Sequence, residues 1–168
     1  MNIKELRAVL IPAINKHCAA PIIMADQMGE RPKVPHATYK LTTPYGKAVG
    51  QAEEIGVVIN GEYKLQRLSD YKTTISFTAY AMDDDDDDSV ELAQKIYDWF
   101  SFAGVDVLQS IGVAVADQTD VINRDAFVIE DYERRNGFDV ILRVPHQQLK
   151  DIESIDTAEI TEGGISHG

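Results

Sequence analysis

The sequence predicts an α+β fold: a mixed, mainly antiparallel sheet packed by an N-terminal helix and a central helix, with projecting β-hairpins. Residues 72–81 alternate between apolar and polar side chains, which is the two-residue period of a strand. Residues 89–103 instead repeat apolar side chains at helical spacing. Asn-Gly pairs at 60–61 and 136–137 stand between alternating runs and signal hairpins. The strand, the acidic segment after it and the helix are expected to form the unit on which the other strands pair.

Length and composition indicate one soluble globular domain. The 168 residues carry 16 Lys plus Arg against 28 Asp plus Glu, a formal net charge of −12. Such a chain lacks the basic footprint that gripping nucleic acid by its phosphates requires, and suits a surface that must not adhere to DNA. The single cysteine, Cys18, excludes an internal disulfide and a cysteine-based zinc site, and is expected to be a small apolar filler. We also expect no signal peptide and no membrane span.

The first helix is predicted over residues 2–17. Apolar residues recur there every three or four positions, at Ile3, Leu6, Leu10 and Ile14. Asn2 can cap the start of the helix, because its side chain can accept hydrogen bonds from free backbone N–H groups. Pro12 lies inside the pattern and predicts a kink or an early break, because proline cannot donate the helical hydrogen bond.

Two strands are expected before the first hairpin. Residues 22–24 suit a short strand, and the proline- and glycine-rich stretch to residue 35 reads as a loop. Residues 36–43 alternate again and are expected to end at Pro44 and Gly46. Residues 51–68 form a hairpin around the first Asn-Gly pair, which is expected to project from the body because its outer face is polar.

Six consecutive aspartates follow the strand at 72–81: Asp83, Asp84, Asp85, Asp86, Asp87 and Asp88. One interpretation is a calcium site, although their spacing does not fit an EF-hand loop, which needs a glycine at position six and a glutamate at position twelve. A purely structural interpretation is a solvated turn. Its last aspartates would stabilise a helix N-terminus, with Asp88 and Glu91 as a capping-box-like pair. A third interpretation is a ring of negative charge in an oligomer.

The central helix is predicted over residues 89–103, with Gly104 just past its end. Tyr97, Trp99 and Phe100 cannot all face one side of a helix, because successive residues are about 100° apart. One of them is therefore expected to be exposed or to lie in an interface, where tryptophan is enriched, and Trp99 is the candidate.

A strand at 111–115 and a polar turn at 117–123 are expected next. Residues 126–135 and 138–144 then form the second hairpin around Asn136-Gly137. Arg134 and Arg135 lie on one arm of it and could pair with Asp139 or with an acidic surface of a neighbour. The single domain is taken to span residues 1–146, and residues 147–168 form an acidic, weakly ordered tail.

No catalytic pattern stands out in the sequence. The four histidines are scattered, and there is no paired metal-ligand spacing on a helix, no phosphate-binding glycine loop and no nucleophile elbow. We therefore expect a non-enzymatic protein without cofactor or metal. The alternative is a small α+β binding module or enzyme with an unrecognised site, which a pocket holding His36 or His146 beside a carboxylate would favour.

Several stretches resemble a known family. These are PHATYKLTTPYG after the first helix, EYKLQRLSDYKTTISFTAYAMDD leading into VELAQKIYDWFSFAG, and INRDAFVIEDYERRNGFDVILRV. They cover about two thirds of the chain and are similar to the neck and tail terminator (tail completion) proteins of tailed bacteriophages and related particles. The six aspartates depart from this family pattern, so the resemblance assigns no role to them.

The resemblance implies a structural protein of the virion tail or neck, assembled in the host cytoplasm. Such a protein forms a ring with itself, usually of six subunits, that closes the tail tube and meets the connector. Tail tube and connector proteins would be its partners, and DNA would pass through the lumen without specific binding. The candidate lumen or interface residues are then Asp83 to Asp88, Trp99, Arg134 and Arg135. A head-completion or connector protein of the same neck is the nearest alternative.

Overall fold

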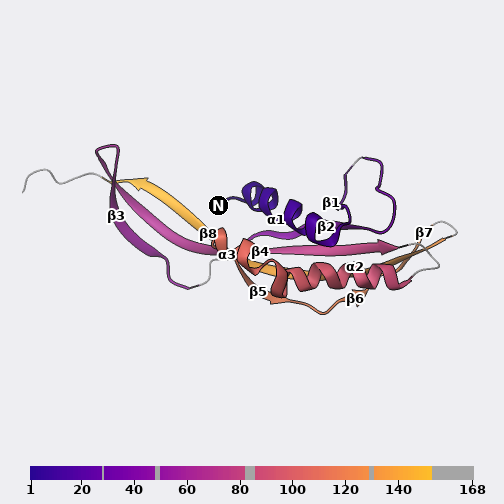
Figure 1. Ribbon diagram of the computed structural model, residues 1–168. Helices are drawn as coiled ribbons and strands as arrows, with labels where there is room; N and C mark the ends of the chain where they lie inside the picture. The colour runs from indigo at the N-terminus through magenta and orange to yellow at the C-terminus, as the bar shows by residue number, and fades with distance from the viewer. Residues whose placement is uncertain (28, 48–49, 82–85, 129–130, 153–168) are drawn as a thin grey trace, which may run out of the picture.

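The computed structural model describes residues 1–27, 29–47, 50–81, 86–128 and 131–152 (Figure 1). Its elements in chain order are α1 (Ile3–Cys18), β1 (Ile22–Met24), β2 (His36–Gly46), β3 (Glu53–Ile59), β4 (Glu62–Ala81), α2 (Asp86–Asp98), the π-helix η1 (Trp99–Ala103), α3 (Val105–Ser110), β5 (Ala114–Gln118), β6 (Ile122–Asn123), β7 (Ala126–Val128) and β8 (Asp131–Asp151). The predicted α+β class, with a mixed and mostly antiparallel sheet, is confirmed.

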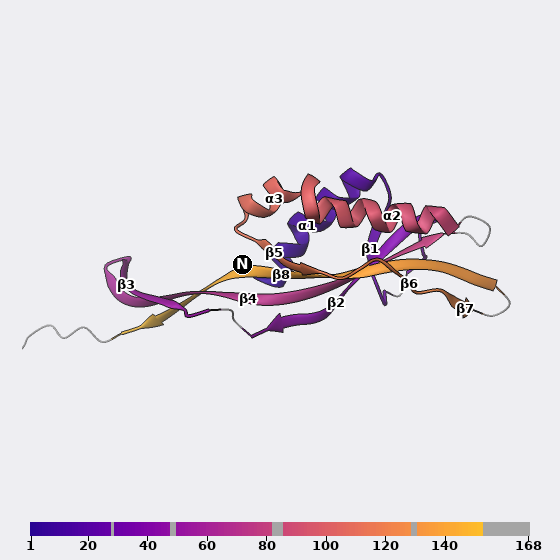
Figure 2. The same cartoon turned by 90° about the horizontal axis from the view of Figure 1, so that it is seen from below.

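The sheet is organised around its two longest strands, β4 and β8. The strand order is β1-β2-β4-β8-β5, with β3 paired to β4 and with β6 and β7 paired to β8. Among the strands of the described residues, only β1 and β2 run parallel. Seen from below in Figure 2, the helices of the described residues all lie on one face of the sheet. The hydrophobic core therefore lies between the helices and that one face.

Alternation along β4 and β8 decides which side chains enter the core. Ile75 and Phe77 are buried, whereas Thr74, Ser76 and Thr78 between them are partly exposed, as predicted. The same alternation buries four side chains of β8, namely Phe138, Val140, Leu142 and Val144. Phe77 pairs with Phe138 in the register, so the two buried rows meet under α2. Two-residue periodicity placed this face correctly because successive side chains of a strand point to opposite sides.

Helix α1 begins as predicted and runs through its proline. The Asn2 side chain accepts hydrogen bonds from the Lys4 and Glu5 N–H groups, both at 2.9 Å, and the Glu5 carboxylate accepts from the Asn2 N–H. The expected early break at Pro12 does not occur, because the helix continues to Cys18. The buried row of Leu6, Leu10, Ile14 and Cys18 stabilises the helix on both sides of the one missing hydrogen bond.

Strand β2 also passes the residues expected to end it. It continues through Pro44 to Gly46, with register shifts between Leu41 and Thr43 and between Thr43 and Gly46. Its pairing with β1 ends at Tyr39, so this part of β2 is an edge. An edge strand accepts a proline because no neighbour requires its N–H.

The first Asn-Gly hairpin is confirmed. Asn60 and Gly61 have φ values of 53° and 84°, and they join Ile59 of β3 to Glu62 of β4. Strand β4 does not stop after this hairpin but continues without a break into the predicted strand at 72–81. The hairpin therefore extends from the body as part of the sheet, and it projects as expected (Figure 1).

The prediction of a second hairpin at Asn136-Gly137 is wrong. Asn136 and Gly137 lie inside β8, opposite Ala79 and Thr78, and the chain reverses between β7 and β8 instead. Packing explains both residues. Asn136 is buried and donates to the Ser89 hydroxyl at 2.8 Å. A Cβ on Gly137 would lie 2.3 Å from the Phe77 carbonyl oxygen, so the close approach of β4 requires glycine there.

The central helix is longer and less regular than predicted. It begins at Asp86, so Asp88 lies inside the first turn and does not cap it, and it continues through η1 and α3 to Ser110. Gly104 is not the left-handed glycine that commonly ends a helix, because its φ is −99°. Because Gly104 has no side chain, the Trp99 ring fits beside it. A Cβ on residue 104 would lie 2.3 Å from that ring.

The remaining boundaries shift by a few residues. The strand expected at 111–115 is β5, which begins at Ala114, and the expected turn contains β6. The predicted tail boundary after residue 146 falls within a strand, because residues 147–151 continue β8 beside β4. Residues 153–168 lie outside the described residues.

Candidate interaction surfaces

Neither a metal cluster nor a membrane helix is found in the described part of the chain. Within those residues, no group of three or more His, Cys, Asp and Glu side chains could hold a metal ion. No helix there combines the length and apolar character that a membrane crossing requires. Cys18 is buried, as expected, and burial raises the pKa of its thiol to about 11, although Lys95 opposes the shift. The features that stand out are surfaces.

The largest of these surfaces is a three-stranded arm. We define the arm as β3, residues 62–68 of β4 and residues 147–151 of β8, which pair in that order. The helices lie over the rest of the sheet, away from the arm (Figures 1 and 2). Several large apolar side chains of the arm are therefore exposed, namely Ile55, Val58, Tyr63, Leu68 and Leu149.

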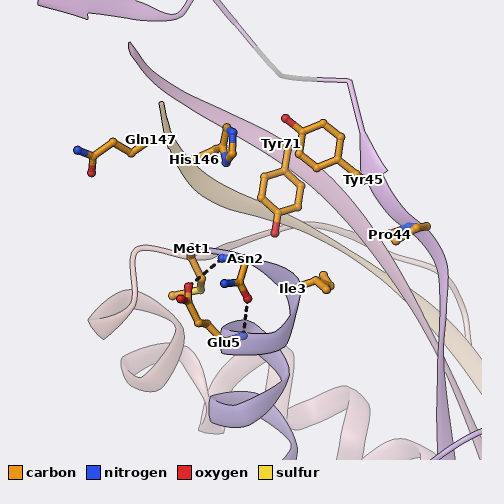
Figure 3. A pocket seen from close by; sticks show the side chains of 9 residues that line it. All are labelled: Met1, Asn2, Ile3, Glu5, Pro44, Tyr45, Tyr71, His146 and Gln147. Atoms are coloured by element: carbon orange, nitrogen blue, oxygen red, sulfur yellow. Dashed lines mark hydrogen bonds between the residues drawn. The ribbon is translucent and has the colours of Figure 1, made fainter. Parts of the chain in front are cut away.

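An apolar pocket lies where the arm meets the body (Figure 3). Its volume is about 500 Å³, and it is lined by Met1, Asn2, Ile3, Glu5, Pro44, Tyr45, Tyr71, His146 and Gln147. Tyr45 stacks on the buried ring of Tyr71 at 4.6 Å between centroids, and His146 lies edge-on to both rings. Burial, with smaller contributions from Tyr45 and Glu5, raises the pKa of Tyr71.

This pocket holds a histidine and a carboxylate, but they do not form a catalytic pair. The Glu5 carboxylate accepts the Asn2 N–H in the cap of α1 (Figure 3). The His146 ring contacts the two tyrosines instead. The pocket therefore suits contact with apolar groups better than acid–base chemistry.

His36, the other histidine considered, lies in the body. It is 2% exposed and stacks on Tyr80 at 5.0 Å between ring centroids. Burial lowers its pKa, and Glu133 opposes this shift. His36 is therefore a neutral core residue at neutral pH, without access to a substrate.

The structure places only part of the aspartate run. Asp83, Asp84 and Asp85 lie outside the described residues, and Asp86 begins α2. Asp87 and Asp88 are exposed in the first turn of α2, where the helix dipole favours negative charge. This end of α2 is the end of the body opposite the arm (Figure 1).

Trp99, a candidate interface residue, is buried within the chain itself. It is 2% exposed and lies edge-on to Phe100 at 5.0 Å between centroids. Both residues are buried and lie in the π-helix η1, in which the Gly104 N–H donates to the Trp99 carbonyl five residues back. Of the three aromatic residues considered, Tyr97 and not Trp99 is the one left partly exposed. The exposed aromatic residue of this segment is Phe102, at 86%.

Arg134 and Arg135 do not reach Asp139, the partner considered for them. Arg124 donates to Asp139 at 3.0 Å instead. Arg134 pairs with Asp125 at 3.1 Å, whereas Arg135 pairs with Glu133 and lies over the Tyr80 ring. Both arginines therefore pair within the chain, on the part of β8 that lies opposite Ala81 and Tyr80 of β4.

Asp125 gives this cluster a dependence on pH. Its carboxylate accepts the Arg135 backbone N–H at 2.6 Å and Arg134 Nη1 at 3.1 Å. Burial raises the pKa of Asp125, but hydrogen bonds from Arg135, Asn123 and Arg134 outweigh it and hold this pKa below its ordinary value. The stabilisation is therefore present above about pH 4 and lost as the pH falls through the lower pKa of the folded state.

The Asp125→Asn variant is expected to lose roughly 1–2 kcal/mol of unfolding free energy at pH 7, because it removes a charged hydrogen-bond acceptor. Its deficit relative to wild type should shrink toward zero as the pH is lowered to about 2, where both side chains are neutral. Urea unfolding across this range checks the prediction, and a deficit that stays constant with pH would contradict it.

Sequence reasoning missed most of the exposed apolar residues. Tyr45, Phe102 and Leu149 carry no local motif, and only the tertiary structure leaves them uncovered. The one available signal was the alternation of residues 53–59, because no predicted helix was available to cover their apolar side chains.

Comparison with known proteins gives one finding. A family model described as "Phage neck terminator protein" matches residues 3–166, nearly the whole chain. No curated protein matches it.

Proposed function

Because the chain belongs to the phage neck terminator protein family, and is thus a structural component of the virion neck, we propose that it forms a homo-oligomeric ring that ends the tail tube and joins it to the connector. The ring has six subunits. Its partners are further copies of this chain, the tail tube protein and the connector proteins. Assembly takes place in the host cytoplasm.

The arm is the observation that carries the oligomeric part of the proposal. It presents uncovered apolar side chains on a sheet that the helices of its own chain do not reach. Soluble monomers rarely expose contiguous apolar surface of this kind, and such surfaces mark interaction sites. A contact between unlike surfaces of identical subunits closes into a ring when the rotation allows it.

The charge of the chain supports passage of DNA without binding. A net charge of −12 repels phosphate groups, so a ring of such subunits offers a lumen to which DNA does not adhere. In this proposal the aspartates at 83–88 contribute to that negative field. The exposed carboxylates of Asp87 and Asp88, at the start of α2, support this assignment.

Two alternatives make different predictions. A head-completion or connector protein of the same neck would also form a ring, but it would not bind the end of an isolated tail tube. A small enzyme or binding module would use the pocket beside Tyr71 and would bind a small molecule as a single subunit. Within the described residues, the engagement of Glu5 in the helix cap speaks against acid–base chemistry in that pocket.

The test measures the mass of the full chain and its binding to tail tubes of the same particle. Native mass spectrometry and light scattering are expected to show a closed oligomer, alone or once tubes are added. Negative-stain images are expected to show it at one end of each tube. A chain that remains a single subunit with tubes present, or that binds only to connector rings, would overturn the assignment as a tail terminator.

A further inference from the structure

We propose that the arm makes the contact between subunits: the outer edge of β3 adds to the sheet of a second copy of this chain, and that copy covers one face of the arm. This inference rests on the proposed ring and names the surface that builds it. It follows from the edge of β3, from the side chains on one face of the arm and from the charge of the arm.

The backbone of β3 offers a free hydrogen-bonding edge. Within the described residues, β3 pairs only with β4, in an unbroken register from Glu53↔Leu68 to Ile59↔Glu62. Ile59 and Glu62 flank a two-residue turn and therefore exchange both hydrogen bonds, after which bonded and unbonded pairs alternate. The N–H and C=O groups of Val58, Gly56 and Glu54 consequently point away from β4, toward a possible fourth strand.

The open edges of β2, β5 and β8 are protected, whereas the edge of β3 is not. The open part of β2 contains Pro44 and two register shifts, and β5 has a register shift between Val115 and Asp117. Beyond its pairing with β5, β8 carries Pro145 and Lys150. Prolines, lysines and bulges prevent strands from pairing with other chains. In contrast, β3 reads EEIGVVI, without proline, lysine or bulge, and is suited to pairing.

One face of the arm carries aliphatic side chains on all three strands, interspersed with polar ones. Residues paired directly across strands share a face, so Ile55, Gln66 and Leu149 form one row and Glu53, Leu68 and Gln147 the next. Val57 and Ile59 extend this face toward the turn. Ile55 is 38% exposed and Leu149 is 49% exposed. We call this surface the aliphatic face of the arm.

The charge of the arm points to a second copy as the occupant. The arm carries four acidic residues (Glu53, Glu54, Glu62 and Asp151) against three basic ones (Lys64, Arg67 and Lys150), a net charge of −1 in a chain of −12. Several of these charges pair within the arm, including Lys64 with Asp151 at 2.8 Å. The arm can therefore approach another acidic copy without the repulsion that the rest of the chain would meet.

The size of the arm fits such a contact. Seven residues of β3 span about 23 Å, and three strands are about 14 Å wide, so each face covers roughly 300 Å². The one covered face and the edge together supply roughly half of the ~800 Å² that each partner buries in a stable protein interface. A three-stranded sheet with two open faces also gains stability when another subunit covers it.

The edge is tested with Val58→Pro, and Val58→Thr is the matched control. Proline at this position removes an outward N–H while keeping the hydrogen bonds to β4, and threonine keeps both the N–H and the side-chain shape. The subunit concentration at half assembly, measured by light scattering on the full chain, is expected to rise about tenfold or more for proline and to stay near wild type for threonine.

The aliphatic face is tested with Leu149→Glu, and Gln148→Glu is the matched control. Both variants add one negative charge to neighbouring exposed residues of β8, but Gln148 lies on the opposite face of the arm. Leu149→Glu is expected to weaken assembly about a hundredfold, because it would bury a charge under the second copy. Gln148→Glu is expected to weaken it far less.

A photo-crosslinking amino acid in place of Val58 keeps the inference testable if a variant fails to fold. The expected product is a cross-link within the ring to a strand of a second copy, identified by mass spectrometry. A ring that forms unchanged in Val58→Pro and Leu149→Glu, or a cross-link only to the tail tube protein, would overturn this inference and leave the proposed function standing. A wild-type chain that never assembles would overturn the proposed function itself.

Discussion

The Phe77→Ala variant is expected to lose about 3–5 kcal/mol of unfolding free energy, because it leaves a cavity that the surrounding core cannot fill. Phe77 is 1% exposed and lies at the centre of an aromatic cluster. Its ring centroid is 5.8 Å from that of Phe138 on the neighbouring strand and 5.5 Å from that of Phe100 beneath it. The variant therefore removes the ring that packs against both Phe138 of β8 and Phe100 of η1.

Urea unfolding followed by circular dichroism measures this loss, and the fluorescence of Trp99 gives a second probe. Phe102→Ala is the matched control, since it removes the same ring from a residue that is 86% exposed, and it is expected to change the free energy by less than about 0.5 kcal/mol. Equal losses in the two variants would show that the core does not lie between β4 and η1. A loss of assembly in Phe102→Ala without a loss of stability would instead mark Phe102 as part of an interface.

The Gly137→Ala variant is expected to cost about 3 kcal/mol, although alanine normally suits a strand better than glycine. The added Cβ would lie 2.3 Å from the Phe77 carbonyl oxygen and 3.1 Å from Thr78 Cα. Both are backbone atoms, so the two longest strands must separate to accept it. Arg124, 3.1 Å from the new atom, would also lose its position between Ser76 and Asp139.

Gly56→Ala provides the comparison for this variant. Gly56 also lies inside a strand, but a Cβ there would meet no atom within 4 Å. Its unfolding free energy should stay the same or rise slightly, because alanine restricts the unfolded chain more than glycine does. If Gly137→Ala were equally harmless, the close approach of β4 and β8 at this position would be wrong.

Gly137 also explains the main error of sequence reasoning. The Asn60-Gly61 and Asn136-Gly137 pairs have the same residues and similar surroundings in sequence, yet only the first forms a turn. At the first pair both residues adopt positive φ, which these residue types favour. At the second pair, the asparagine serves a buried hydrogen bond to Ser89 and the glycine serves close strand packing. Both demands come from residues far away in sequence.

The sequence predicted the kind of functional site, an interaction surface, but it did not predict which residues form that surface. The resemblance of the sequence to neck and tail terminators agrees with the family match, and it implied surfaces in place of a catalytic centre. Among the residues proposed from sequence, Trp99 is buried in the core, and Arg134 and Arg135 pair within the chain. Exposure depends on what the rest of the chain covers, which a local pattern does not record.

Local patterns in the sequence were enough to predict the fold class, the cap of the first helix, the buried faces of β4 and β8 and the first hairpin. Each of these follows from interactions within a few residues or from a regular period. Long-range pairing and packing make β4 and β8 single long strands, bury Trp99 in the core and leave the edge of β3 unprotected. These features depend on pairing and packing between distant segments, whose free energy outweighs local preference.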